Sequence, residues 1–579
     1  MKHATFLLLF IFLTAQLTSA ESTSEAEMAK MIQASLIIKD NATACQDAYK
    51  ALLQHPQSQP LSELYIQTLA KTGQLQPMMQ AWQQYEKTFP DPYDNTALLE
   101  EMAWGVIFKG SNSSSPLLRA MSVIGAFYGQ DEKGVTVLHK HLYDNNSLVR
   151  AVTVKLASRL RDAALCDSIV QLLKEERVWR VRLEVIKAAG QMKIHAVKPE
   201  LLAIIADNRT HAEEKAAAIQ ALVTLLDQIG DEEVKKLAQS DRVGLRLLAC
   251  EAIAYFHKKS CLNFLLPLLK DPNSEVRIAA LQTIGRMRVN NIEDKPIVEI
   301  AAAMLQDHDH RVAITSAWLL TLHDTALGQQ AFIPWINHQN RETRRYAAGA
   351  LGGTGKYGAP LMLFYLKQHS DPLIRINLAL ALMGQRVAVG EACDEVYNSF
   401  ILDKDRWMWQ DFGIFRLLAP NTTRFCEAGI EDPEAINQSV RLDILNIMAV
   451  MKYNKAQEAI SHFLQQKSWG ICGSASALLL TECDESALVL VMNMLDDPRY
   501  TIRIQAALIL SMWGRDEKAI TVLQDAYSSA DRRLKEKILE GVGGIGAKSS
   551  VPFLVEKLGE PYQALSIIAA SSLLQCLYH

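Results

Sequence analysis

The chain is poor in aromatic residues and carries little net charge. Aromatics make up 7% of the 579 residues, and the formal net charge is −4. So small a net charge gives no general attraction to nucleic acid. Charges spread along the chain argue against a multi-span membrane protein, and 49% hydrophobic content argues against disorder. Few aromatics beside many Leu, Ala and Ile residues favour helices.

Motifs that would mark an enzyme or a metal site are also missing. The sequence has no H-E-x-x-H, no G-x-S-x-G and no C-x-x-C. A G-x-G-x-x-G at 541–546 and a phosphate-loop-like stretch at 352–356 both fall where a helix meets a turn, not after a strand. His308 and His310, beside two aspartates, are interpreted as solvated turn residues rather than cation ligands. We therefore expect no catalytic site, no cofactor and no metal.

Residues 1–20 have the layout of a secretory signal peptide. Lys2 is followed by an apolar stretch from Ala4 to Leu17, and small residues lead to Ala20 before Glu21. The stretch is too short to span a bilayer comfortably, so an uncleaved anchor is the lesser alternative. We expect cleavage after Ala20, export to the periplasm of a Gram-negative bacterium or to the outside, and no membrane span in the mature chain.

The chain has nine cysteines, an odd number, so at least one thiol has no intrachain partner. Disulfides are possible in an exported protein, whereas small buried thiols are the simpler interpretation. Cys250 with Cys261, and Cys472 with Cys483, are the pairs to test first.

A repeat of 31 to 36 residues runs through most of the chain. Similar segments begin at Asp144, Asp271 and Asp497, each with an acid, a turn, and an aliphatic-Arg pair that opens an apolar helix. Two short helices per repeat could bury their apolar stripes only by stacking on their neighbours. The position of the arginine, called here the arginine slot, is occupied by the following residues: Arg119, Arg150, Arg182, Lys215, Arg246, Arg277, Ala313, Arg344, Arg375, Trp409, Arg441, Cys472, Arg503, Lys535 and Ser566.

This pattern resembles the HEAT repeat, in the short form named after phycobilisome lyases. The resemblance implies an all-α solenoid of about fifteen helix pairs over residues 111–579. It also implies a structural ladder in which an acid six residues before each arginine helps to link successive repeats. Asp307 and Glu560 precede Ala313 and Ser566 instead of arginine, so we expect the ladder to be broken there. The expected ladder residues are Asp144, Arg150, Glu176, Arg182, Asp271, Arg277, Asp497 and Arg503.

Residues 21–110 differ from the rest and are predicted to form a separate helical region. Its apolar positions recur after 34 residues, and Gly73 lies between two helical stretches. This spacing resembles a degenerate pair of tetratricopeptide repeats. The stretch 110–116, rich in Ser and Asn, is the expected boundary.

Two stretches could bind a partner. The window from Lys140 to Glu200 has 12 basic and 7 acidic residues, whereas 390–440 has 4 basic and 10 acidic. The first is interpreted either as ordinary solvated helix faces or as a basic surface for an acidic protein segment or another anionic surface. The aromatic stretch 407–425 is interpreted either as a recognition hot spot or as filling of a seam in the solenoid. The candidate protein-binding residues are Arg150, Lys155, Arg159, Arg180, Arg182, Trp407, Trp409, Phe412 and Arg416.

These observations favour an exported, non-enzymatic scaffold or adaptor that binds another protein on its curved face. One alternative is an enzyme or enzyme partner similar to the bilin lyases, which work inside cells, so the signal peptide argues against it. A third possibility is a nucleic-acid-binding HEAT solenoid. Export and the negative net charge argue against it.

Overall fold

The computed structural model describes residues 24–129, 131–160, 162–401, 405–421, 433–465, 486–513 and 516–578. The expected signal peptide therefore lies outside the described residues. The chain divides into two compact units. Unit 1 combines Met1–Gly129 with Ala530–His579, and unit 2 is Gln130–Ser529. The boundary expected near residue 110 does not coincide with this division and stays a prediction.

Unit 2 is a row of helix pairs. The first helices of the pairs are α8 (Glu132–His141), α10 (Ala163–Glu175), α12 (Lys198–Ala206), α14 (Asp231–Ala238), α16 (Leu265–Leu268), α18 (Ile297–Met304), α20 (Thr325–Ile336), α22 (Ala359–Gln368), α24 (Val389–Val396), α26 (Ala456–Gln465), α28 (Ser486–Asn493) and α30 (Glu517–Tyr527). The second helices are α9 (Ser147–Leu160), α11 (Trp179–Gln191), α13 (Ala212–Leu225), α15 (Val243–Tyr255), α17 (Ser274–Met287), α19 (His310–His323), α21 (Arg341–Gly352), α23 (Pro372–Gly384), α25 (Pro433–Val450) and α29 (Tyr500–Trp513).

The second helices α9 to α23 form one continuous layer, because each packs against the next. We call them, together with α25, the inner layer. Their starts follow from the turn chemistry of the repeat: side chains of Asn273, Asp309, Asn340 and Asp371 accept a hydrogen bond from a backbone N–H in the first turn of their helices. The acid-rich turn that defines the repeat in the sequence is thus also the signal that starts each second helix.

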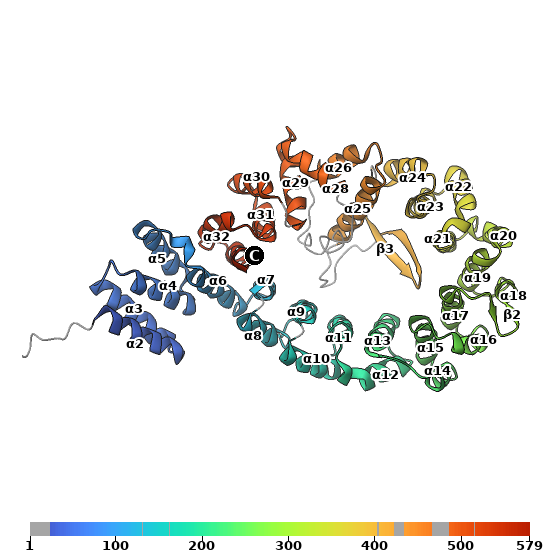
Figure 1. Ribbon diagram of the computed structural model, residues 1–579, viewed down its shortest axis with the longest axis horizontal. Coiled ribbons are helices and arrows are strands. Elements are labelled where there is room, and N and C mark those ends of the chain that lie inside the picture. Colours follow the sequence, from blue (N-terminus) through green and yellow to red (C-terminus); the bar gives the residue numbers. More distant parts are fainter. Residues whose placement is uncertain are drawn as a thin grey trace, which may run out of the picture. The chain divides into compact units, whose positions relative to one another are not determined.

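Two antiparallel hairpins interrupt the helices among the described residues. One is small, β1 (Asn291–Ile292) with β2 (Lys295–Pro296). The other pairs β3 (Trp407–Phe412) with β4 (Phe415–Pro420) and lies on the side of unit 2 formed by the inner layer (Figure 1). The fold is an all-α solenoid as predicted. The arginine slot at Trp409 is wrong, however, since that residue lies in a strand rather than in a second helix.

Unit 1 contains both ends of the described chain. Its helices are α2 (Glu25–Ile37), α3 (Asn41–Gln54), α4 (Gln59–Lys71), α5 (Leu75–Thr88), α6 (Thr96–Ser111), α7 (Pro116–Gly129), α31 (Arg532–Ile545), α32 (Val551–Lys557) and α33 (Gln563–Tyr578). A capping box between Ser24 and Glu27 starts α2. Gly73, with φ +69°, makes the turn between α4 and α5 that the sequence predicts.

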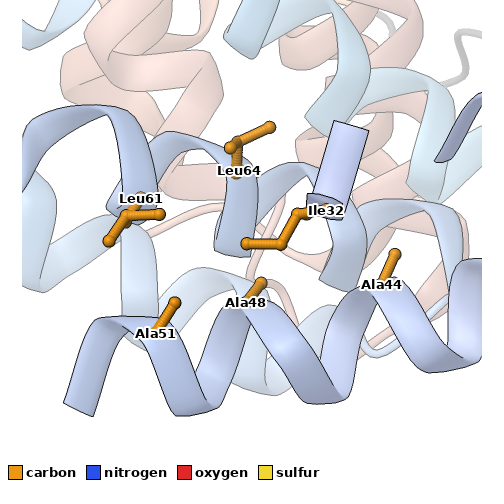
Figure 2. Packing of buried hydrophobic residues seen from close by; sticks show 6 residues of the cluster. All are labelled: Ile32, Ala44, Ala48, Ala51, Leu61 and Leu64. Atoms are coloured by element: carbon orange, nitrogen blue, oxygen red, sulfur yellow. The ribbon is translucent and has the colours of Figure 1, made fainter. Parts of the chain in front are cut away.

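Small side chains let the first helices of unit 1 approach one another closely. Ala44, Ala48 and Ala51 form one stripe of α3, and Ile32 of α2 packs against it together with two leucines of α4 (Figure 2). All three alanines are buried. A larger residue in this stripe would force the helices apart, since interiors are close-packed.

The last helix, α33, packs against α6 and α7 near the start of the chain as well as against α31 and α32. The contact is close at Gly110, where a Cβ atom would lie 2.5 Å from Cδ1 of Ile567. Most of α33 is buried, including Ile567 and Leu573. Residues separated by more than 400 positions therefore fold as one unit.

Candidate protein-binding surface

Six slot arginines of unit 2 tie their repeats to the next ones: Arg150, Arg182, Arg246, Arg277, Arg344 and Arg375. Nη1 of Arg277 donates to the backbone carbonyl of Asp271, in its own repeat, at 2.7 Å. Nε and Nη2 donate to the carboxylate of Asp307, in the next repeat, both at 2.8 Å. The two side chains are largely buried, and a buried ion pair is costly to break by removing one partner. Corresponding carboxylate contacts join Arg150 to Glu176 at 2.7 Å, Arg246 to Asp271 at 2.6 Å and Arg344 to Asp371 at 3.1 Å.

Several predicted ladder residues contact the neighbouring repeat, but the pairing differs from the six-residue spacing. Within a repeat, the arginine bonds the backbone of the acid, while the acid's side chain binds the arginine of the preceding repeat. Asp307 therefore keeps its link although Ala313 follows it, and the break falls one repeat later than expected. Arg503 also bonds the carbonyl of Asp497, at 2.9 Å, whereas the Asp497 carboxylate pairs with Arg499.

Two ladder acids come from positions that the repeat pattern does not mark. Arg182 pairs with Glu214 of α13, because the expected acid position of that repeat holds Arg209. Arg375 pairs with Glu395 of α24 at 3.0 Å. Both acids lie away from the regular acid position, so the repeat pattern does not identify them as ladder residues.

Ionisation of Glu176 is coupled to its ladder contacts. Burial alone would raise the pKa of Glu176, but hydrogen bonds from Arg150 and from the backbone N–H of Val178 outweigh it, so the pKa lies below its ordinary value. The ladder acid is therefore held in its charged form.

The β3–β4 hairpin is the largest departure from the repeat. A two-residue turn at Gly413 and Ile414 joins its strands, and Gly413 has φ +62°, which favours glycine. A Cβ atom at Gly413 would also meet the side chain of Gln282 on α17. The tip of the hairpin therefore lies directly on the inner layer.

Aromatic contacts hold one face of the hairpin on α19 and α21. The ring of Phe415 lies 5.4 Å from Trp318 and 5.8 Å from Tyr346, and Phe412 lies 5.3 Å from Tyr346, all edge to face. At Gly349 of α21, a Cβ atom would lie 2.7 Å from Cδ2 of Leu417. On the inner layer, the aromatic rings of Trp318 and Tyr346 thus contact the phenylalanines of the hairpin, and Gly349 leaves space for Leu417.

Polar contacts fix the register of the hairpin. The buried Asn377 of α23 accepts a hydrogen bond from Leu418 N–H at 2.7 Å and donates to Leu418 C=O at 3.0 Å, as a neighbouring strand would. Arg345 of α21 donates to Gln410 at 2.6 Å, and Gln282 donates to Phe412 C=O at 3.3 Å. Helices from successive repeats therefore each contribute a side chain to one bound segment.

The predicted residues Trp407, Trp409, Phe412 and Arg416 are in this hairpin, whereas 422–425 of the aromatic stretch lie outside the described residues. Trp407 is 5% exposed, and its backbone N–H donates to Asn437 of α25 at 3.0 Å. Trp409 donates from Nε1 to Asp443 at 3.2 Å, and the guanidinium of Arg416 lies 5.0 Å from its ring. These intramolecular contacts agree with the seam interpretation for Trp407. A recognition role for Trp409, Phe412 and Arg416 stays a prediction.

The predicted basic residues separate into two groups. Arg150 and Arg182 belong to the ladder and form ion pairs with Glu176 and Glu214. Lys155 and Arg159 of α9 and Arg180 at the start of α11 are exposed. Among the described residues, Lys155 and Arg159 have no acid within ion-pair distance. The sequence could not separate the groups, because both are arginines or lysines of the same helices.

In the described part of the chain, no group of three or more His, Cys, Asp or Glu residues could hold a metal ion. The glycines at 541–546 end α31, and Gly546 adopts φ +72° as its C-cap, in agreement with the turn interpretation. The stretch 355–357 is a single helical turn between α21 and α22.

The six described cysteines are free thiols, and Cys250 and Cys261 do not form the disulfide that the sequence suggested testing. Burial raises the pKa of Cys250 and of Cys576 to about 12. Both are therefore unreactive, in line with a packing role. Cys472 and Cys483 lie outside the described residues.

Residues 135–223 and 232–321 match HEAT repeats. No curated protein shows significant similarity to the chain. The crystal structure of Kap121p is similar at 11% identity, with 96% of this chain and 78% of that chain covered and a TM-score of 0.35. UNC-45 from C. elegans in complex with an Hsp90 peptide gives 11% identity, 98% and 83% coverage and a TM-score of 0.35. The CpcE–CpcF phycocyanin lyase complex from Nostoc gives 14% identity, 52% and 92% coverage and a TM-score of 0.22.

None of the helices in the described ranges combines the length and the apolar character needed to cross a bilayer.

Proposed function

We propose that the protein is an exported, non-enzymatic scaffold that binds another protein through the inner layer of its solenoid. One observation carries this proposal. The inner layer already holds an extended segment of this chain, the β3–β4 hairpin, through side chains from successive repeats such as Trp318, Tyr346 and Asn377. A surface that recognises a strand of its own chain in this way has the chemistry to recognise another.

Export is proposed from the first twenty residues, whose basic start, apolar stretch and small residues before Glu21 fit a cleaved signal peptide. The compartment proposed is the periplasm of a Gram-negative bacterium or the outside of the cell. The mass of the intact protein purified from its own cells tests this: a chain that begins at Glu21 supports export, and a chain that keeps Lys2 contradicts cleavage.

A non-enzymatic role is proposed because the sequence contains none of the nucleophile or metal motifs named above. The repeats are proposed to be of the short phycobilisome-lyase type, since most arginine slots are 31 or 32 residues apart. The helices α2–α5 are proposed to be tetratricopeptide-like. Positions that are 34 residues apart in α3 and α5 are buried alike: Ala44 with Met78, Ala48 with Trp82 and Ala51 with Tyr85.

Affinity capture of the tagged full-length protein from its native cells, followed by mass spectrometry, tests the scaffold proposal. A protein present in stoichiometric amount supports it. A bound pigment or other small molecule without any protein partner contradicts it and favours a lyase-like role instead.

A further inference from the structure

The β3–β4 hairpin identifies which positions of a second helix face a bound segment. Counted from the arginine slot, Gln282 and Trp318 are five residues on, and Tyr346 and Asn377 are two residues on. All four contact the hairpin. Gly349 and Gly353, which Leu417 and Phe415 approach, are five and nine residues on. Since the repeats share one frame, the same positions must face the same side in the repeats that the hairpin does not reach.

On the helices α9, α11 and α13, several of these positions are exposed in the part of the chain that the structure describes. We call this surface the open face. It includes five exposed residues at positions five and nine: Lys155, Arg159, Lys187, Gln191 and Gln220. The open face is thus the continuation of a layer that binds an extended segment further along the chain.

Charge distinguishes the open face from the part that the hairpin occupies. The hairpin lies on Trp318, Tyr346 and glycines, which match its phenylalanines. The open face instead carries Lys155, Arg159 and Lys187. Counting only described residues, Lys187 alone has an acid within ion-pair distance, Glu184 at 2.9 Å. An acidic ligand could therefore pair with Lys155 and Arg159, two cations that no described carboxylate neutralises.

We propose that the open face binds an extended acidic segment of the partner protein. This rests on the proposed function and names the part of the partner that is recognised. Helix axes in such a layer lie about 8–10 Å apart, so three helices span about 20 Å. At about 3.3 Å per residue, an extended chain crosses them in about six residues. Its carboxylates would meet Lys155, Arg159 and Lys187.

A protein segment fits this surface better than a nucleic acid. Single strands are held by stacked aromatic rings in a basic channel. None of the five exposed residues of the open face is aromatic, and Glu184 lies beside Lys187. The polar Gln191 and Gln220 instead offer hydrogen bonds to a peptide backbone, as Asn377 does for the hairpin.

The test uses the mature full-length chain and a fluorescein-labelled twelve-residue peptide of alternating Glu and Ser, with binding followed by fluorescence anisotropy. The variant Lys155→Glu/Arg159→Glu reverses two charges on the open face. The matched control Arg209→Glu/Lys236→Glu makes the same change in net charge at exposed residues of a turn and of α14. All four residues are exposed, so circular dichroism and the melting temperature should stay unchanged in both variants.

We expect the open-face variant to weaken peptide binding about tenfold or more and the control to change it less than about twofold. Equal weakening in both variants would overturn the proposal, because it would indicate attraction by net charge alone. Tighter binding of a twelve-nucleotide single strand, lost with Lys155 and Arg159, would overturn it in favour of nucleic acid.

A last comparison separates this inference from the scaffold proposal. If a stoichiometric protein partner is captured equally by the wild type and by Lys155→Glu/Arg159→Glu, the open-face inference fails and the scaffold proposal stands. If the partner is captured by the wild type and the control but not by the open-face variant, both stand.

Discussion

Asn377 provides the sharpest test of how the inner layer holds the β3–β4 hairpin. Replacing it with Ala removes the donor and the acceptor that satisfy both backbone groups of Leu418, which is fully buried. Each orphaned group costs about 1–3 kcal/mol, or about 2–6 kcal/mol together. The buried side chains of Phe415, Leu417 and Leu418 contribute about 1.5–3 kcal/mol each. The hairpin should therefore stay docked but open far more often.

Hydrogen exchange followed by mass spectrometry measures that opening. A loss of at least about 2 kcal/mol predicts that peptides covering 407–420 exchange at least about thirtyfold faster in Asn377→Ala. The control is Thr283→Val, which removes a buried hydrogen bond to the Cys250 carbonyl between α17 and α15 and leaves the hairpin contacts intact. Unchanged exchange at 407–420 in Asn377→Ala, or equal acceleration in both variants, would refute the contact as described.

Three further predictions concern the ladder and unit 1. Replacing Arg277 with Met should lower the free energy of unfolding in urea by about 3–5 kcal/mol, because it leaves Asp307 buried without its partner. The depressed pKa of Glu176 stabilises the fold above its unfolded value of 4.5, and this contribution is lost as pH falls through the folded pKa. Glu176→Gln should therefore lower the urea midpoint at pH 7 and make it less sensitive to pH below 4.5. Deleting 563–579, which removes α33, should speed hydrogen exchange in α6 and α7 while the inner layer of unit 2 stays protected.

Each of these predictions has an outcome that would contradict it. The double change Arg277→Met/Asp307→Asn should recover part of the lost stability, and no recovery would show that the two side chains act independently. If the urea midpoint of Glu176→Gln changes with pH below 4.5 as the wild-type midpoint does, the Arg150–Glu176 contact adds no pH-dependent stability. Normal protection of α6 and α7 without α33 would show that the two ends of the chain fold separately.

The helices of the solenoid could be predicted because each repeat carries its own local signals. The repeat spacing places the slots Arg150, Arg277 and Arg344 correctly in second helices. A turn signal acts over a few residues, so one sequence suffices to find it. The acids that pair with these arginines are harder to predict from the sequence. An arginine can reach any carboxylate that the neighbouring repeat brings within range, such as Glu214 or Glu395.

The β3–β4 hairpin and the packing of α33 against α6 could not be predicted from the sequence. Strand propensity in 407–420 is moderate, and only contacts with Trp318, Tyr346 and Asn377, far away in the chain, decide that it forms a hairpin there. The burial of α33 against α6 is equally non-local. Spacing within one repeat carries no information about either contact.

Photo-crosslinking in the native cells tests the central claim most directly, that a partner protein binds the inner layer. A photoreactive phenylalanine analogue is placed at Gln220, an exposed inner-layer residue of α13, or at Leu202, an exposed residue of the preceding first helix α12. We predict a covalent adduct with one protein partner from position 220 and none from position 202. An adduct from position 202 alone, or equal adducts from both positions, would contradict recognition by the inner layer.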